Sequence, residues 1–126
     1  MESIKKGDTV LGIILRNIPA GSVPMTEGTE PLQVVTLKHP SGTHLQAHRH
    51  DPRERTTSAM HECLVVVKGK VRIGIYDKEG ELFVSRDLGA GEAYLSMNGG
   101  IGIDIVEDAE VIEIKNGPFV EDKILL

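Results

Sequence analysis

Residues 42–69 have the sequence GTHLQAHRHDPRERTTSAMHECLVVVKG, and this stretch decides the predicted fold. We expect the segment that carries His48 and His50 to be an extended strand, which Asp51-Pro52 ends because proline cannot donate to a ladder. Alternation along a strand places His48 and His50 on one face. Their Cα atoms would then lie about 7 Å apart, a spacing from which two imidazoles can converge on one ion.

A carboxylate follows the two histidines after a polar interruption. Arg53 to Met60 has little periodicity, and we predict a loop there that forms a rim or lid. Glu62 comes next, and the apolar run Cys63 to Val67 is typical of a strand, which we expect to end at Lys68-Gly69. Two histidines and one carboxylate on adjoining strands form a candidate metal site.

The rest of the chain is a series of short β-branched runs between turns rich in glycine and proline. The expected strands are residues 9–16, 32–38, 63–67, 71–76, 82–88, 93–97, 101–106 and 109–115. Apolar residues nowhere recur at helical spacing for three turns. The pattern therefore predicts an all-β sandwich or barrel. The expected core includes Ile13, Ile14, Val34, Val66, Ile73 and Ile103.

Composition narrows the class of partner and the compartment. The chain has 126 residues, enough for one domain, and a formal net charge of −5, which argues against nucleic acid or an anionic membrane as the main partner. Cys63 is the only cysteine, so no internal disulfide is possible and a reducing cytosol is expected. The N-terminal apolar run is too short for a signal peptide, and no stretch has the length of a membrane span. We expect a cytoplasmic protein.

The spacing around the histidines resembles the first motif of the cupins. Gly42 is followed by five residues and then by His48-x-His50, and Glu62 is followed by six residues and then by Gly69. The intervals from glycine to histidine and from glutamate to glycine agree with the motif. The interval between His50 and Glu62 is longer than the usual one.

The second cupin motif is degraded in this chain. Gly91, Met97 and Gly99 lie at about its spacing, but no histidine follows them. Residues 99–102 are GGIG, where the small single-domain cupins of the polysaccharide-biosynthesis neighbourhood (WbuC-like cupin-fold metalloproteins) have GGHG. Residues 113–118 are EIKNGP, which resembles their E-V-K-x-G-P. The resemblance extends from about residue 32 to the C-terminus.

The resemblance implies a double-stranded β-helix, the cupin jelly-roll barrel, as a single domain over residues 1–126. Its parts would be an N-terminal strand segment at 1–30, a barrel at 31–115 and a C-terminal tail at 116–126. Metal ligands are implied at His48, His50 and Glu62. The fourth ligand of the family, a histidine, would fall at Ile101 or Gly102, neither of which can coordinate. A homodimer is also expected, because small cupins commonly pair or exchange N-terminal strands.

Two interpretations of the site remain open. The three ligands could hold a divalent metal such as Fe, Mn, Ni or Zn with open coordination positions. Alternatively the barrel is a pocket that binds its ligand without metal. In either case a small molecule is the expected partner. The candidate substrate-binding residues, which line the expected cavity or its rim, are His44, Gln46, Arg53, Arg55 and Ile101.

Three functions are compatible with these residues, and no catalytic residue is assigned. The first is a metal-binding cupin of unassigned activity, an oxygenase or isomerase of a small anionic molecule. The second is a metal-free module that binds a sugar or another small ligand and is linked to polysaccharide biosynthesis. The chain has no tryptophan to stack on a pyranose, which counts against the sugar. The third is a structural or regulatory subunit. Among neighbouring residues, we expect His61 to be exposed and Cys63 to be a buried structural thiol.

Overall fold

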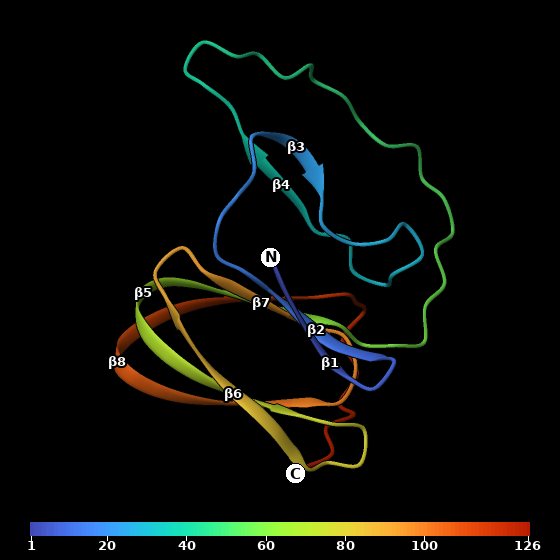
Figure 1. Cartoon of the computed structure of the whole chain (residues 1–126). Coiled ribbons are helices and arrows are strands. Elements are labelled where there is room, and N and C mark those ends of the chain that lie inside the picture. The colour runs from blue at the N-terminus through green and yellow to red at the C-terminus, as the bar shows by residue number, and fades with distance from the viewer. The chain divides into compact units, whose positions relative to one another are not determined.

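A computed structural model describes all residues, 1–126, and every element in it is a β-strand (Figure 1). The strands are β1 (Glu2–Lys6), β2 (Thr9–Leu15), β3 (Gly21–Pro24), β4 (Val35–Lys38), β5 (Glu62–Tyr76), β6 (Leu82–Gly89), β7 (Ala93–Ser96) and β8 (Gly100–Lys115). The predicted all-β class is therefore confirmed. A membrane-spanning helix of sufficient length and apolar character is absent from the structure.

The chain divides into two compact units. The first unit comprises Met1–Asn17 together with Met60–Leu126, and the second unit comprises Ile18–Ala59. Each has its own sheet, of six strands in the first unit and of two strands in the second. The predicted partition into a segment at 1–30, a barrel at 31–115 and a tail at 116–126 stays a prediction.

The sheet of the first unit is antiparallel and curls into a half-barrel. Its strand order is β1-β2-β7-β5-β6, and β8 pairs with β5 as well. β5 pairs with β7 through residues 62–65 and with β6 through residues 70–76, while β8 accompanies β5 over residues 62–76. Figure 1 shows β5 and β8 curving together around one side of the half-barrel. β5 therefore connects the part of the sheet that contains β7 with the part that contains β6, and β8 runs beside β5 along both parts.

The β5–β8 ladder is irregular around Gly69. The register between β5 and β8 shifts three times between Val66 and Val71, and Gly69 has a φ of 78°. A Cβ at this position would overlap the carbonyl oxygen of Asp108 on β8. Bulges of this kind bend a strand and increase its twist. The sequence led us to expect two strands separated by a turn here, and the structure instead has one bent strand, because β8 continues across the break.

The core lies on one face of the curled sheet. Val71, Ile73 and Ile75 alternate along β5 as predicted, and all three are completely buried. They cluster with Ile4, Leu11, Ile14, Leu64, Val66, Leu88 and Tyr94. The prediction of Ile103 as a core residue is wrong, since its side chain is 42% exposed. Ile103 is the Cα partner of Ile73, but β8 has a partner strand only on the β5 side, so its other side is open.

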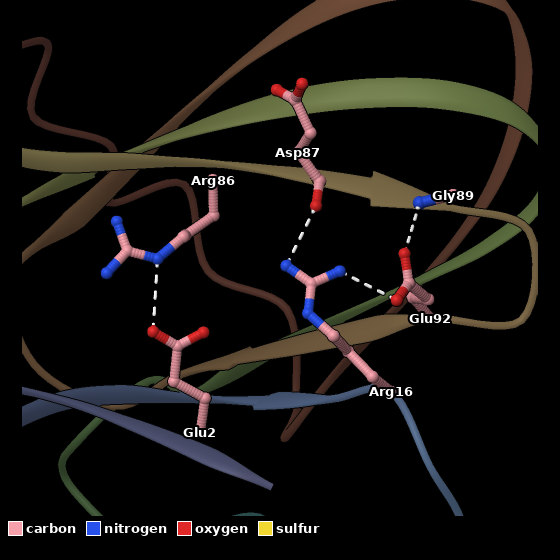
Figure 2. Close-up of polar contacts among 6 residues, drawn as sticks. All are labelled: Glu2, Arg16, Arg86, Asp87, Gly89 and Glu92. Atoms are coloured by element: carbon pink, nitrogen blue, oxygen red, sulfur yellow. Dashed lines mark hydrogen bonds and ion pairs between the residues drawn. The ribbon is translucent and has the colours of Figure 1, made fainter.

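Side-chain bridges hold the ends of the strand order together (Figure 2). The Nε atom of Arg86 on β6 donates to the Oε2 atom of Glu2 on β1, at 3.1 Å. Arg16, which follows β2, donates to the carboxylate of Glu92 at 2.7 Å and to the carbonyl oxygen of Asp87 at 3.0 Å. β1 and β6 are the two ends of the order β1-β2-β7-β5-β6, so these contacts stabilise the curled form of the sheet.

Asp77 organises the turn between β5 and β6. One carboxylate oxygen accepts hydrogen bonds from the backbone N–H groups of Glu79 and Glu81, at 3.0 and 2.9 Å, and the other pairs with the ammonium of Lys6 on β1. The Asp77 residue is only 4% exposed. The hydrogen bond from Lys6 and the backbone N–H of Glu81 hold the pKa of Asp77 below its ordinary value.

We expect the stabilising effect of Asp77 to disappear in acid. The pKa is lower in the folded chain than in the unfolded chain, so the group stabilises the fold above its unfolded pKa of about 4 and loses this effect as the pH falls through the folded pKa. Urea denaturation of the native protein and Asp77→Asn would measure this, and the native protein should be the more stable only at neutral pH. A difference that stays constant into acid would contradict the assignment.

The second unit has a two-stranded sheet and a long segment without secondary structure. β3 pairs with β4 in antiparallel register, from Gly21 opposite Lys38 to Pro24 opposite Val35. The strand expected at 32–38 is thus limited to Val35–Lys38, and β3 lies in a segment that we expected to be turns. The strand expected to carry His48 and His50 is wrong, because residues 43–59 form no ladder. Alternation alone makes no strand where the backbone lacks a partner.

Candidate functional site

The two histidines of the HxH triplet are close together in the second unit. The ring centroids of His48 and His50 are 5.1 Å apart, with the rings edge to face at 81°. The Nδ1 atom of His48 lies 3.1 Å from the carbonyl oxygen of Gln46, to which it must donate because a carbonyl only accepts. This bond leaves the lone pair on Nε2 of His48. Metal-binding histidines are commonly fixed in this way by their other ring nitrogen.

The other candidate residues of this segment are exposed. His44 and Gln46 precede the pair, and Arg53 and Arg55 follow it, all with side chains open to solvent. The guanidinium of Arg55 donates to the carbonyl oxygen of Arg53 at 3.5 Å. Arg53 and Arg55 are therefore two accessible cations a few residues from the histidines, as an anion-binding rim would require.

Glu62, the predicted third ligand, begins β5 in the first unit. It is half-buried, and its Cα partners are Ser96 on β7 and Lys115 on β8. The Nζ atom of Lys115 lies 3.6 Å from the Oε1 atom of Glu62 and 2.6 Å from that of Glu113. The hydrogen bond with Glu113 and, to a smaller extent, the charge of Glu62 raise the pKa of Lys115. The Glu62 carboxylate therefore already has a cation beside it.

Ile101, near the start of β8, lies at the opposite end of the β5–β8 ladder from Glu62, whose partner on β8 is Lys115. Ser96 ends β7 as the Cα partner of Glu62, and only the short turn of residues 97–99 separates β7 from β8. Ile101 is the Cα partner of Ile75 and packs against the core cluster. The residue at the position of the histidine in the resembled motif is thus a core-facing isoleucine.

Two residues beside Glu62 have clear structural roles. Cys63 is buried as predicted, and burial raises the pKa of its thiol. The prediction that His61 is exposed is wrong, since the residue is only 3% exposed. Its backbone N–H donates to the Oδ1 atom of Asn116 at 2.8 Å. Residues 61 and 63 point to the same face of an extended strand, so the expected burial of Cys63 could have predicted the burial of His61.

Sequence analysis also missed a buried tyrosine near the same end of the sheet. Tyr94 is completely buried on β7, and its hydroxyl donates to the carbonyl oxygen of Leu11 at 3.3 Å. Burial raises the pKa of the phenol far above its ordinary value. The ring reaches toward Gly12, where a Cβ would overlap the Tyr94 hydroxyl. The tyrosine is neutral at physiological pH, and its hydroxyl serves the packing of β2 against β7.

The first unit has a cavity that is lined by other residues than those of the candidate site. Its volume is about 340 Å³, and it is lined by Lys6, Gly7, Thr9, Leu11, Asp77, Lys78 and Glu79. Two of the lining charges, Lys6 and Asp77, pair with each other. None of the residues predicted for the site lines this cavity.

The predicted ligands belong to different units, with His48 and His50 in the second unit and Glu62 in the first. Across residues 1–126, no three His, Cys, Asp or Glu side chains are grouped so that they could hold a metal ion. Comparisons of the chain with family models, with curated proteins and with solved structures found no match. The candidate site therefore depends on the chemistry and local geometry of its own residues.

Proposed function

We propose that the chain is a metal-binding protein with the cupin fold, in which His48, His50 and Glu62 hold a divalent metal ion. The observation that carries the proposal is the geometry of the histidine pair. The rings are 5.1 Å apart, and the Nδ1 atom of His48 is committed to the carbonyl of Gln46, which leaves Nε2 to bind. Two imidazoles and one carboxylate are a donor set that suits Fe(II), Mn, Ni or Zn.

The incomplete edge of the half-barrel supports the cupin fold. β8 has a partner strand only on the β5 side, and three of its isoleucines, Ile103, Ile105 and Ile112, are between 42% and 60% exposed. A long apolar edge of this kind favours the addition of further strands.

The proposed activity is that of an oxygenase or isomerase acting on a small anionic molecule in the cytoplasm. When bound, the metal supplies a Lewis acid or activates dioxygen at its open positions. Arg53 and Arg55 bind and orient the anionic group of the substrate, because exposed guanidinium forks match carboxylate and phosphate oxygens. His44, Gln46 and Ile101 line the pocket. The homodimer expected from the resemblance is part of the same proposal.

Metal content measures the proposed function directly. Protein purified without a histidine tag or chelator is expected to contain close to one Fe, Mn, Ni or Zn per chain. The His48→Ala/His50→Ala variant is expected to lose this metal, because the carboxylate alone binds weakly. Glu62→Gln is expected to reduce it. His39→Ala is the matched control, because His39 is an exposed histidine of the same unit whose ring contacts Ser22.

The control should retain the metal content of the native protein. Native protein that is isolated empty and takes up no added metal would contradict the proposal. Equal metal in the native protein and in His48→Ala/His50→Ala would show that any ion binds elsewhere.

The metal-free ligand pocket remains the second candidate because of one observation, the ammonium of Lys115 beside Glu62. A carboxylate that already has a cationic partner does not need a metal to balance its charge. A panel of small anions and nucleotide sugars, tested for thermal stabilisation of metal-free protein, distinguishes the two candidates. Stabilisation by such a ligand in the absence of metal would favour the pocket.

A further inference from the structure

The side of β8 that faces away from β5 pairs with no strand. β5 has β7 and β6 on one side and β8 on the other, so the sheet of the first unit ends at β8. A strand in this position presents backbone N–H and C=O groups with which a further strand can pair. Every residue from 103 to 108 is exposed. Residues 103–108, the β8 edge, are therefore open to the addition of a strand.

The face of the sheet opposite to the core carries a row of alternating charge that stops at the β8 edge. Arg72 on β5 is the Cα partner of both Asp87 on β6 and Asp104 on β8, so the three side chains lie on one face. The guanidinium of Arg72 lies 2.7 Å from the carboxylate of Asp87. The hydrogen bond to Asp87 raises the pKa of Arg72, and the charge of Asp104 raises it further. A cation on a strand beyond Asp104 would continue the row.

The same pairing of charges is repeated along the ladder. Lys70 is the Cα partner of Glu107, and Lys68 is the Cα partner of Glu110, with 3.5 Å between the ammonium and carboxylate groups of the second pair. Basic residues of β5 thus lie opposite acidic residues of β8. Because β8 has no second partner strand, these carboxylates have no cation opposite them on the other side. Charge complementarity therefore favours an added strand that carries basic residues.

The other face of the β8 edge favours apolar residues on the added strand. Ile103 and Ile105 are the Cα partners of Ile73 and Val71, which are completely buried, but their own side chains are 42% and 60% exposed. Side chains of a strand alternate between the two faces, so a strand that matches both faces has basic and apolar residues in alternation. Residues 70–73 of β5, KVRI, already pair with β8 in this pattern.

A second copy of the chain is a poor match for the β8 edge. Antiparallel pairing of two β8 strands would place Asp104, Glu107 and Asp108 of both copies in one ladder, and like charges opposite each other destabilise a sheet. The formal net charge of −5 adds to this repulsion and attracts a basic partner instead.

We propose that the β8 edge binds an extended segment of another protein in which lysine or arginine alternates with apolar residues. The segment is added to the sheet as a further strand. Main-chain hydrogen bonds then supply affinity, and the alternating side chains supply specificity. This interaction goes beyond the proposed metal-dependent function and does not depend on it.

The peptide KVKVKVKV, labelled with a fluorophore at its N-terminus and amidated at its C-terminus, is the probe. Its binding to the full chain is measured by fluorescence anisotropy at fixed ionic strength. It is expected to bind roughly tenfold more tightly than KKKKVVVV, which has the same composition and charge without the alternation. EVEVEVEV keeps the alternation with the opposite charge, and it is expected not to bind.

Variants of the β8 edge test where the peptide binds. Asp104→Asn/Glu107→Gln should weaken binding of KVKVKVKV by about threefold to tenfold, as expected for the loss of two exposed ion pairs. Ile105→Lys should abolish it, because a lysine on an edge strand opposes pairing and repels a basic peptide. Asp8→Asn/Glu79→Gln is the matched control, since it removes the same charges from exposed turn residues of the same unit. Thermal unfolding verifies that each variant is folded.

Binding of KVKVKVKV that both edge variants weaken and the control variant retains would support the inference. Equal binding of KVKVKVKV and KKKKVVVV would indicate attraction of charge without addition of a strand, and would overturn it. A native protein that binds neither peptide would overturn it as well. A native dimer that Ile105→Lys converts into a monomer would assign the β8 edge to a second copy, against the inference.

Discussion

Replacement of Gly69 by alanine is expected to destabilise the first unit severely. Gly69 has a φ of 78°, a backbone conformation that residues with a Cβ rarely adopt. The added Cβ would also overlap the carbonyl group of Asp108 and crowd the Cα atom of Ala109, both of which belong to the backbone of β8. Strain and overpacking together should cost about 3–6 kcal/mol, which is comparable with the whole stability of a small domain.

Gly91→Ala is the control for the backbone conformation alone. Gly91 has a similar φ of 82°, but a Cβ there would have no atom within 4 Å. The expected loss is therefore about 1–2 kcal/mol. Urea denaturation of both variants measures the two free energies of unfolding. Equal losses would mean that the close approach of β8 to Gly69 contributes nothing.

The bend at Gly69 matters for the candidate site as well as for stability. Glu62 and Ile101 lie on opposite sides of this irregularity, since Glu62 pairs with Lys115 and Ile101 pairs with Ile75. The chain also connects the two ends through Ser96, the Cα partner of Glu62, and the turn of residues 97–99. The glycine that ends the first cupin-like motif thus has a structural role of its own.

Local patterns were sufficient to predict the class of the fold and most of its strands. The alternation of Val71, Ile73 and Ile75 identified the buried face of β5, since a period of two is a property of a single strand. The same patterns could not predict that 62–67 and 71–76 are one strand. That depends on β8, whose hydrogen bonds continue on both sides of Gly69. The short, charged β1 gave no apolar pattern and was missed.

The candidate site shows the same division between local and non-local information. The rings of His48 and His50 are close together, although the strand expected to place them is absent, and their role as metal ligands stays a prediction. Lys115 could not be predicted as the neighbour of Glu62, because their pairing depends on the register between two distant strands. The metal, the substrate and the dimer stay predictions, since they depend on contacts that residue spacing alone does not define.

Introduction of the missing fourth ligand by Ile101→His is expected to produce the largest gain in metal retention. Ile101 lies near the start of β8, which the turn of residues 97–99 connects to Ser96, the Cα partner of Glu62 on β7, and it occupies the position at which the resemblance implies a histidine. A fourth protein ligand completes the tetrahedral set that Zn²⁺ prefers and adds one imidazole for the other metals. The affinity should rise by at least the roughly tenfold to hundredfold that supporting residues of metal sites contribute.

Metal retained after dialysis against a weak chelator measures this gain. Ile103→His is the control, because Ile103 lies two residues further along the same face of β8 and does not occupy the position at which the resemblance implies a histidine. Ile101 packs against the core whereas Ile103 is 42% exposed, so the thermal stability of both variants is measured beside the metal content. Higher retention for Ile101→His alone places the start of β8 beside the metal. Equal retention by the native protein and a folded Ile101→His would mean that this strand is too far from the ligands, because an added imidazole within reach of the ion has no reason to remain unbound.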